Sequence, residues 1–373
     1  MKKIRSICLI LSMGCLAFPQ IMNSDKPEKG RWDLQMKKIW EIAGAGPDVF
    51  GVIQEIAISE DGRIYVLDAK KFKISIFTEN GKFISAFGKK GEGPGEIKNL
   101  RMGTQLFTVG NHIIVVDRGR IHYFTREGKF IKTSPYPFQT KPQAFVSENL
   151  FISAPATIDD PRKQEARVKL YNLKDKTEKV IASFKPFKKA TSTEETKGSQ
   201  ITIAIVIGDI TPLMLVRYHE GKIYQGMTNQ YQIQVMDLEG KPIKRFGIEN
   251  RKPIKISDQY KKELGARFND APQDMVKKII DGLPETASYF YNLFIDKNGM
   301  IYMLVSNPES SSQISIDIFS PQGEYLYQSE IRVEDGVTIN NIALWRNFLF
   351  ITQEDEDGDQ TITRYSIHLP VEK

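Results

Sequence analysis

Short apolar runs alternate with turns that carry Gly or Asn, and this alternation repeats along nearly the whole chain. The stretches "ISEDGRIYVLD" from Ile58 and "FIDKNGMIYMLV" from Phe294 share one shape. Each is an apolar strand, an Asp-Gly or Asn-Gly turn, and a second strand that opens with Ile-Tyr. Such turns between alternating apolar runs predict a β-hairpin. Six first hairpins are expected, with turns near Gly62, Gly110, Asn149, Gly221, Gly299 and Asn347.

A second turn follows each of the first five hairpins, and the first three of these second turns are 47 residues apart. Each unit is therefore four strands long. Four strands in 40–50 residues are typical of one blade of a β-propeller. The chain is predicted to be all-β, a single six-bladed β-propeller over residues 34–373. The second turns lie near Gly81, Gly128, Asp175, Gly240 and Gly323.

The sixth unit has only three strands of its own before the chain ends. The missing strand is expected from the other end, where "LQMKKIWEIAG", Leu34–Gly44, aligns with the fourth strand "GKFISAFGKKG" of the first unit. This N-terminal strand is predicted to close the last blade. Closure leaves no long unpaired edge between the first and last blades.

The glycine-rich stretch "GEGPGE", Gly91–Glu96, is predicted to be a joint between blades. A phosphate-binding loop needs a strand before it and a helix after it, but the residues that follow turn into a strand. A partial copy, "AGAGPDVF" from Ala43, stands before another blade. Glycine allows positive φ and Pro94 fixes one φ, which suits a tight connection.

Two insertions interrupt the repeat, and both follow the fourth strand of one blade. One is a polar excursion over residues 186–200. The other, residues 257–286 between blades 4 and 5, is predicted to be helical. Ser257 or Asp258 can cap a first helix, and Asp270 can cap a second helix that has Pro272 in its first turn and ends at Gly282. The second helix carries an apolar stripe of Met275, Val276, Ile279 and Ile280.

All connections between blades emerge on the same face of a propeller, and loops on a rigid scaffold commonly carry binding residues. Polar residues at the starts of inner strands should rim the channel on this face. Arg101, Arg245 and Arg267 should make the face locally basic, so that it prefers an anionic or carboxylate-bearing partner. The candidate ligand-binding residues are Gln54, Arg101, Gln143, Arg267, Tyr291, Asn292 and Asn341.

The N-terminus reads as an export signal. A basic start precedes an apolar run, Ile7–Leu16, that is too short to span a bilayer. Two processing routes stay open. Cleavage after Ala17 would give a signal peptide of residues 1–17, and a lipoprotein signal to residue 14 would leave a lipid on Cys15. Residues 18–33 would then be a linker. The protein is expected in the periplasm, at the cell surface or outside the cell.

Several kinds of chemistry are disfavoured. Both cysteines, Cys8 and Cys15, lie in the signal segment, which excludes a cysteine nucleophile or redox pair in the mature chain. The formal net charge of +6 falls to about +3 once the basic residues of the signal are removed, too weak to argue for nucleic acid. The four histidines lie outside the inner-strand positions that a channel zinc site or a His-based catalyst would need. They are His112, His122, His219 and His368.

The stretches "DGRIYVLD" and "GKFISAFGKKGEGPGEI" resemble the NHL-like six-bladed β-propellers, especially those exported by bacteria. This architecture hosts binding proteins, lactonases and lyases, so the resemblance indicates a fold more than a function. The leading hypothesis is a monomeric, non-enzymatic module that binds a protein, a peptide or a small anionic ligand, with no cofactor. The alternative is a hydrolase or lyase that depends on a divalent cation. Lactonases of this fold hold Ca²⁺ in the channel, which implies Glu55 with Asn292 or Asn341 as ligands here.

Overall fold

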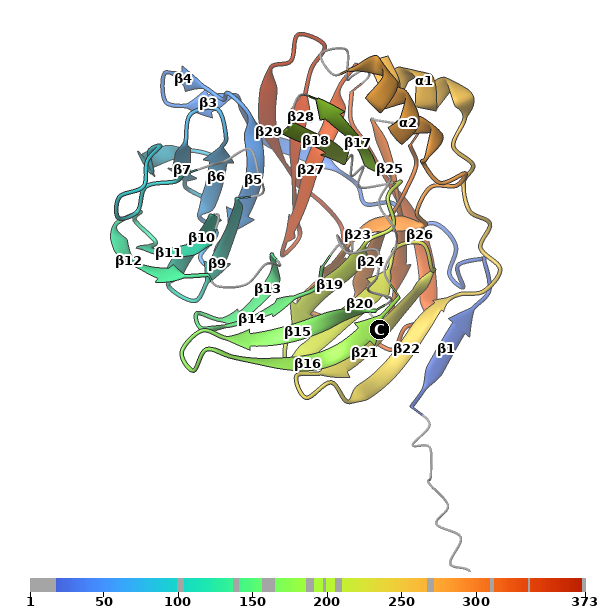
Figure 1. Cartoon of the computed structure of the whole chain (residues 1–373). Helices are drawn as coiled ribbons and strands as arrows, with labels where there is room; N and C mark the ends of the chain where they lie inside the picture. The colour runs from blue at the N-terminus through green and yellow to red at the C-terminus, as the bar shows by residue number, and fades with distance from the viewer. Residues whose placement is uncertain are drawn as a thin grey trace, which may run out of the picture.

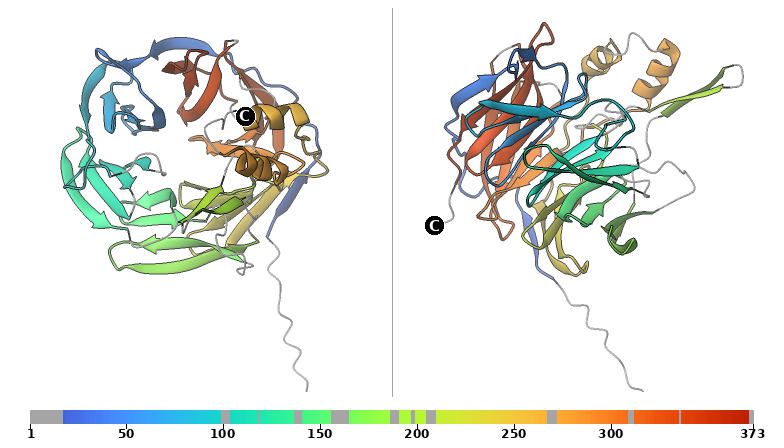
Figure 2. Two further views of the ribbon diagram at one scale, coloured as in Figure 1. Left: turned by 45° about the horizontal axis from the view of Figure 1, so that its top comes forward. Right: turned by 90° about the vertical axis from the view of Figure 1, so that its left-hand side faces the viewer.

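The computed structural model describes residues 18–98, 104–117, 119–136, 141–155, 165–185, 191–196, 199–204, 210–266, 272–308, 312–334 and 336–370. In this part of the chain, five four-stranded sheets and one five-stranded sheet surround a common axis, and two short hairpins and two helices lie beside them (Figures 1 and 2). The six-bladed β-propeller predicted from the repeats is confirmed.

The first three blades follow one another along the chain, each with its first strand innermost. Blade 1 comprises β5 (Ile53–Ile58), β6 (Ile64–Asp68), β7 (Lys73–Phe77) and β8 (Phe83–Phe87). Blade 2 comprises β9 (Gln105–Val109), β10 (His112–Asp117), β11 (Arg120–Thr125) and β12 (Phe130–Pro135). Blade 3 comprises β13 (Pro142–Ser147), β14 (Leu150–Ser153), β15 (Ala166–Asn172) and β16 (Thr177–Phe184).

The last three blades include strands from the N-terminal segment. Blade 4 comprises β19 (Met214–His219), β20 (Lys222–Met227), β21 (Gln232–Asp237) and β22 (Pro242–Ile248), with β1 (Gln20–Asn23) as a fifth strand. Blade 5 comprises β23 (Phe290–Ile295), β24 (Ile301–Val305), β25 (Gln313–Phe319) and β26 (Tyr325–Arg332). Blade 6 comprises β27 (Thr338–Trp345), β28 (Phe348–Glu354), β29 (Gln360–Ser366) and β2 (Lys37–Ile42).

Strand β2 closes the ring, as the repeat count predicts. It pairs antiparallel with β29, from Lys37 opposite Ser366 to Ile42 opposite Ile362. The edge that blade 6 would otherwise expose is therefore covered by the N-terminal end of the chain. Leu34, just before β2, is buried in the cluster between blades 5 and 6.

Residues 18–33, which the sequence presents as a linker, form a strap around the outside of the ring. Strand β1 runs parallel to β22 on the outer edge of blade 4. The segment around Gly30 then pairs with β26 of blade 5, where the N–H groups of Glu28 and Trp32 donate to the carbonyls of Tyr325 and Gln328, both at 2.8 Å. The strap thus crosses blades 4 and 5 before it enters blade 6 as β2 (Figure 1).

Asn23 connects the strap to two blades at once. Its Nδ2 donates to the carbonyls of Gly247 in blade 4 and Gly323 in blade 5, at 2.8 and 2.9 Å. Its Oδ1 accepts from the Tyr325 N–H at 2.9 Å. Both donors and the carbonyl oxygen of one short amide thus help to hold the outer edges of neighbouring blades together.

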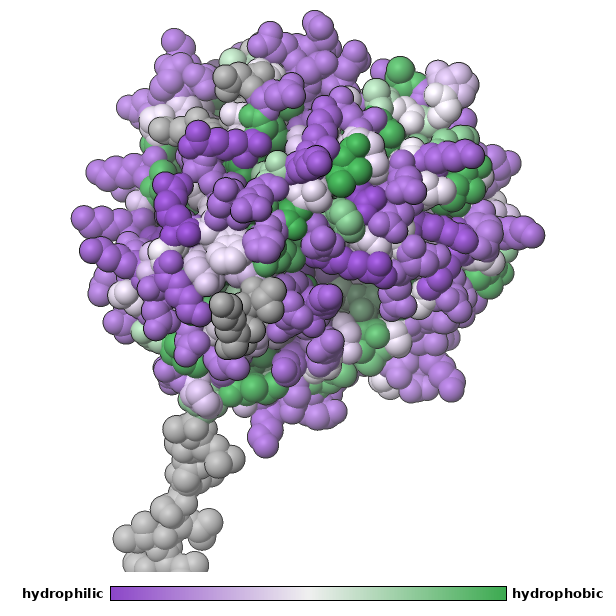
Figure 3. Space-filling model, turned by 180° about the vertical axis from the view of Figure 1, so that it is seen from behind, coloured by the Kyte–Doolittle hydropathy of each residue, from purple (hydrophilic) through white to green (hydrophobic). Residues whose placement is uncertain are grey.

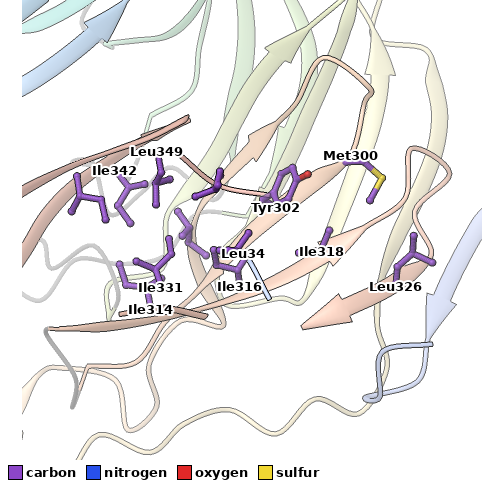
Figure 4. Packing of buried hydrophobic residues seen from close by; sticks show 13 residues of the cluster. Leu34, Met300, Tyr302, Ile314, Ile316, Ile318, Leu326, Ile331, Ile342 and Leu349 are labelled. Carbon is purple, nitrogen blue, oxygen red and sulfur yellow. The ribbon is translucent and has the colours of Figure 1, made fainter. Parts of the chain in front are cut away.

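The hydrophobic core is divided into clusters that lie between neighbouring blades. One of these clusters, between blades 5 and 6, includes Leu34, Tyr302, Ile316, Leu326 and Ile351 (Figure 4). Another joins blade 6 to blade 1. Because apolar side chains alternate along each strand, both faces of a blade contribute to such interfaces. The ring is therefore held by packing at every junction, including the closing one.

Glycines at the second turns are needed for two reasons: the backbone there has a positive φ, and there is no space for a side chain. Gly128 and Gly323 have φ of +81° and +104°, in the region where side chains are strained. A Cβ on Gly128 would also lie 2.4 Å from the Phe87 ring, and one on Gly323 would lie 2.6 Å from Phe246 Cβ. Each turn thus packs against the fourth strand of the preceding blade, which explains why Gly recurs at this position.

The connection between blades 1 and 2 is a joint, as predicted. The N–H of Gly93 donates to Glu96 Oε2 at 2.9 Å, and the Ile97 N–H donates to the Lys89 carbonyl at 2.9 Å. The loop's own carboxylate therefore takes a backbone donor that a phosphate would need. The next strand in the described residues is β9.

The two insertions project from one face of the ring (Figure 2). Between blades 3 and 4 lies the hairpin β17 (Thr191–Thr196) and β18 (Ser199–Ala204), and between blades 4 and 5 lie α1 (Asp258–Ala266) and α2 (Gln273–Asp281). Helix α2 contacts both α1 and β17, so insertions from consecutive connections meet. These four elements are referred to together as the cap.

The two helices of the cap have most of the capping and burial features that the sequence pattern predicts. The Ser257 Oγ accepts from the Tyr260 N–H at 3.1 Å and caps α1. In α2, Met275, Val276 and Ile279 are buried, Ile280 is partly buried, and Lys277 is exposed. Pro272 occupies the N-cap position and not the first turn, and Asp270 lies outside the described residues. The elements that α2 contacts include β17 of the other insertion.

A short antiparallel neck separates the helices from the ring. The Ile256 N–H donates to the Glu285 carbonyl at 3.0 Å, and the Ala287 N–H donates to the Ile254 carbonyl at 2.8 Å. Leu264 and Ile256 pack with Ile210, which precedes blade 4. No helix among the described residues is long and apolar enough to cross a membrane.

Candidate functional site at the ring axis

The innermost strand of each blade has one edge with no neighbouring strand, and this edge faces the ring axis. Backbone N–H and C=O groups on such an edge need hydrogen-bond partners. Polar side chains near the starts of the inner strands supply several of them. These side chains are called the polar ring, and of the predicted candidates it includes Gln54, Gln143, Asn292 and Asn341.

Blade 1 is tied to blade 2 by two adjacent residues of the polar ring. Gln54 Nε2 donates to the Thr104 carbonyl at 2.6 Å, and Glu55 Oε2 accepts from the Leu106 N–H at 2.8 Å. The inner-strand edge of blade 2 thus gains both a donor and an acceptor from its neighbour.

The same arrangement continues toward blade 4. Gln105 Nε2 donates to the Pro142 carbonyl at 2.9 Å. Gln143 Nε2 donates to the Met214 carbonyl at 3.0 Å, and its Oε1 accepts from the Val216 N–H at 2.9 Å. A glutamine fits these positions because one side-chain amide can pair with both a C=O and an N–H.

Blade 4 contributes an arginine in place of an amide. Arg217 donates from one terminal nitrogen to Asn292 Oδ1 of blade 5 at 2.5 Å, and from the other to the Val216 carbonyl at 2.9 Å. Asn292 Oδ1 also accepts from the Leu293 N–H at 2.9 Å, and Asn341 Oδ1 accepts from the Ile342 N–H at 2.8 Å. These two asparagines therefore orient their own strands.

Several of the inner strands share an irregularity near these residues. The pairing register shifts at Gln54, at Gln143 and at Tyr291, with one residue skipped each time. An extra residue in one strand bends it and redirects its side chains. The polar positions found by aligning the repeats thus coincide with backbone irregularities at the ring axis. Tyr291 itself packs against the core between blades 5 and 6.

Glu55 and Arg217 are the charged members of the polar ring among the described residues, and they lie on blades 1 and 4. Each keeps some exposed surface, but desolvation is the largest influence on both. Both side chains therefore lie deep in the protein and still reach solvent. Burial raises the pKa of Glu55 to about 7, against the Leu106 N–H and the charges of Arg217 and Lys141, which lower it.

The two predicted arginines of the site, Arg101 and Arg267, lie outside the described residues. The described charges of the helical insertion are nearly balanced between lysines and carboxylates, and the acidic turn after β28 lies on the same face by topology. Charge among the described residues therefore does not single out a basic mouth. The insertion residues concerned are Lys261, Lys262, Lys277, Lys278, Asp258, Glu263, Asp274, Asp281 and Glu285.

No group of three or more His, Cys, Asp or Glu side chains among the described residues is arranged to hold a metal ion. The oxygens suggested for a channel Ca²⁺ have other roles, since Asn292 and Asn341 accept backbone hydrogen bonds and Glu55 accepts from Leu106. His122 is buried in blade 2, and burial lowers its pKa to about 4.

Sequence reasoning missed Arg217 and Gln105 as members of the polar ring. Arg217 interrupts the apolar run "MLVRYH" of blade 4, which was a visible signal. The long insertion before that blade blurred the repeat alignment. Gln105 follows a segment whose start was aligned at Arg101 instead. A buried-strand position with a charged residue was the clue that could have found Arg217.

Six blades, five with four strands and one with five, surround a tied inner ring and define a six-bladed β-propeller. Residues 48–332 match the family described as DUF5128, 6-bladed beta-propeller, and the chain belongs to this family. No curated protein matches the sequence.

Two solved structures from Bacteroides share the fold. A member of the DUF4221 family from Bacteroides vulgatus has a TM-score of 0.56 at 14% identity, over 90% of this chain and 99% of that chain. A protein of Bacteroides fragilis, named as a candidate exported protein, has a TM-score of 0.54 at 11% identity, over 95% of this chain and all of that chain. At these identities the likeness supports the fold alone.

Proposed function

We propose that this protein is an exported, non-enzymatic binding β-propeller whose ligand approaches the face that carries the cap. The observation that carries this proposal is the contact between α2 and β17. Two insertions that the repeat does not need come from consecutive connections and meet on one face. A scaffold with extra elements gathered on one face is typical of a binding protein.

The surface on the far side of the molecule in Figure 1 is mainly polar. The side of the molecule seen in Figure 3 is mainly hydrophilic, with apolar groups scattered and not gathered into one broad patch. Partner-binding surfaces in soluble proteins commonly include a contiguous apolar area. The partner is proposed to be a protein, a peptide or a small anionic ligand, and the propeller is proposed to act as a monomer.

Export is supported by the sequence of residues 1–17 and by the name of the Bacteroides fragilis neighbour. The NHL-like character of the turns is consistent with exported bacterial propellers. Mass spectrometry of the native protein tests this part. A mature chain that starts at Cys15 with lipid, or at Phe18 without it, is expected, and an intact Met1 in a cytoplasmic fraction would contradict export.

A hydrolase or lyase that uses a divalent cation is the second candidate. It is favoured by Glu55, one of whose oxygens has no hydrogen-bond partner among the described residues. The other oxygens suggested for the site are already occupied, which makes binding the better-supported function.

A thermal-shift screen with a matched pair of proteins tests the proposal. Residues 257–284 are replaced by a short Gly-Ser linker that leaves the neck from Ile254 to Ala287 intact. A library of peptides, carboxylic acids and oligosaccharides is screened on both proteins. A ligand that binds the folded state raises the melting temperature. Hits that stabilise the full protein and lose their effect in the variant are expected.

The controls separate the two candidate functions. Circular dichroism and a cooperative melt show that the ring of the variant still folds. Hits that stabilise both proteins equally would place the site away from the cap and contradict the proposal. Ester or lactone hydrolysis that EDTA abolishes in the full protein would favour the enzyme instead.

A further inference from the structure

We propose that Glu55 and Arg217 form the two ends of a site for a small zwitterion, a free α-amino acid or a short unblocked peptide, at the ring axis. The proposal deepens the proposed function, because it names a ligand class for the channel that the cap overlooks. It rests on the placement of two opposite charges on opposite blades and on the hydrogen-bonding capacity that each retains.

The two residues face each other by topology. Glu55 belongs to β5 of blade 1, and Arg217 belongs to β19 of blade 4. In a ring of six, blades 1 and 4 are opposite. Inner-strand contacts run from β5 to β9, β13, β19 and β23, which fixes this order around the axis. The two charges act on each other electrostatically, since each is named among the groups that shift the pKa of the other.

No hydrogen bond or ion pair joins Glu55 to Arg217 among the described residues. Glu55 uses one oxygen for the Leu106 N–H and has no described partner for the other. Arg217 uses its two terminal nitrogens for Asn292 and Val216, and a guanidinium carries five N–H groups. An acceptor on one wall and donors on the other are therefore left for a molecule that lies between them.

A zwitterion can pair with the charges of both Glu55 and Arg217, whereas a simple ion can pair with only one of them. The carboxylate of an amino acid can accept from Arg217, and its ammonium group can donate to Glu55, each at the 2.7–2.9 Å of a charge-assisted hydrogen bond. A lone anion would leave the Glu55 carboxylate buried opposite a like charge, and a lone cation would face Arg217. Buried charges are unfavourable unless they are paired.

The side-chain amides next to the site make it polar, but their hydrogen bonds to the neighbouring blades hold them in fixed positions. Gln54, Gln105 and Gln143 spend their side-chain donors on the carbonyls of the next blade. They can frame a ligand without leaving their backbone partners. Asn292 is held by Arg217 and by the Leu293 N–H, so the arginine is fixed in place before any ligand arrives. A preorganised group loses little freedom on binding.

Binding is expected to strengthen with pH between pH 6 and pH 8. An ammonium group needs an ionised Glu55, and the charged groups that act on this carboxyl are Arg217 and Lys141. Because burial raises the Glu55 pKa to about 7, a bound ammonium group would draw a proton out of the site. Proton release at pH 7 is thus a signature that a ligand on the cap surface would not give.

The test uses the full mature protein and defined probes. A mixture of the twenty free L-amino acids and a mixture of unblocked dipeptides are added separately, with calorimetry in two buffers of different ionisation enthalpy. Single components are then resolved. We expect at least one mixture to raise the melting temperature with proton release, and N-acetylated or C-amidated forms of the same compounds to be inactive.

Variants assign the effect to the site. Glu55→Gln and Arg217→Lys should each lower the affinity about 10- to 100-fold, the effect of losing one charge-assisted hydrogen bond. Glu41→Gln, at an exposed carboxyl of β2 in blade 6, should leave the affinity unchanged. If both site variants fail to fold, two measurements on the wild-type protein still test the proposal. These are the binding of the N-acetylated or C-amidated compounds and the proton release on binding. The proposal is overturned if neither mixture stabilises the protein, or if blocked forms bind equally well.

This outcome is separable from the failure of the proposed function. A hit in the cap-dependent screen with no amino acid or dipeptide binding would overturn the channel site alone. Amino acid binding that survives removal of residues 257–284 would support the channel site and contradict a role for the helical insertion.

Discussion

Glu55 shows how much one side chain at the ring axis is constrained. Burial raises its pKa to about 7, while the Leu106 N–H at 2.8 Å and the charges of Arg217 and Lys141 favour the carboxylate. The residue therefore has a structural role, the tie to blade 2, and a titration that falls near neutral pH. Perturbed carboxyls in an opening are frequent at functional sites, although structural networks perturb them too.

Replacing Glu55 by Gln should change the pH dependence of stability. Because the folded-state pKa is above the ordinary value of 4.5, the native state loses stability as pH rises from about 4.5 through 7. The loss is at most about 3 kcal/mol. The variant should therefore gain stability relative to the wild type between pH 4 and pH 8, measured by denaturant unfolding. If the difference in unfolding free energy between the variant and the wild type were the same at pH 4 and pH 8, this would contradict the burial of Glu55.

Asp317 anchors a second network, which joins blades 4 and 5. It is fully buried and accepts from Tyr231 Oη, from Tyr325 Oη at 2.6 Å and from Arg251 at 3.0 Å. Arg251 begins the connection that leads to the cap and also pairs with Asp25 of the strap. This carboxylate thus contacts residues of two blades directly, and it is linked through Arg251 to the strap and to the connection that leads to the cap.

Removal of this carboxylate should be costly. Asp317→Ala leaves the partly buried Arg251 without its internal counter-charge, which typically costs about 3 to 5 kcal/mol of unfolding free energy. The matched control is Asp61→Ala, whose partners Arg63 and Arg126 are partly exposed, and a loss below about 1 kcal/mol is expected there. Equal losses in chemical denaturation would show that the Asp317 network adds nothing beyond a surface pair.

At the scale of elements, the N-terminal strap and β2 hold the ring at three blades. The strap pairs with the outer edges of blades 4 and 5, and β2 completes blade 6. The two parts should differ in importance. Loss of the strap exposes two outer edges but leaves every blade with four strands, whereas loss of β2 opens the junction between the first and last blades.

Two truncations separate these contributions. Removal of residues 1–33 should lower the melting temperature and leave a soluble monomer. Removal of residues 1–44 should cause aggregation or a much larger loss, because an uncovered strand edge pairs with other chains. Size-exclusion chromatography and thermal melts measure both. A monomer with an unchanged melting temperature after the longer truncation would contradict the closure.

The repeat could be predicted from sequence because its signals are local. Asp-Gly and Glu-Gly turns and alternating apolar runs specify each hairpin within a dozen residues, and Gly128 shows a positive φ and a close packing contact at one position. The strap could not be predicted in this way. Four residues of β1 pair in parallel with a strand more than two hundred residues away, and no local pattern encodes that partner.

The candidate site was only partly predictable for a related reason. Alignment of the repeats found Gln54, Gln143 and Asn292, because each stands near the start of an inner strand. It could not show that their hydrogen bonds go to the next blade, since that depends on ring geometry. Arg217 was missed because the insertion before blade 4 shifts the spacing on which the alignment relied.

At the scale of the whole molecule, the strap determines on which side of the ring the N-terminal segment lies relative to the cap. Strand β1 begins opposite Arg245 and runs parallel to β22 toward the connection that carries the cap helices. The chain therefore enters β1 from the end of blade 4 that points away from the cap. If Cys15 carries a lipid, the cap face would be directed away from the membrane and toward a ligand in solution.

The most direct test of the central claim, that the cap face is the binding face, is site-specific photocrosslinking in the native host. A photoreactive amino acid replaces Lys277, exposed on α2, or Lys174, exposed in a turn of blade 3 at the opposite face. Adducts are quantified by mass spectrometry. The account predicts a specific adduct from position 277 and none from position 174. Adducts from position 174 alone, or equal yields from both, would contradict it.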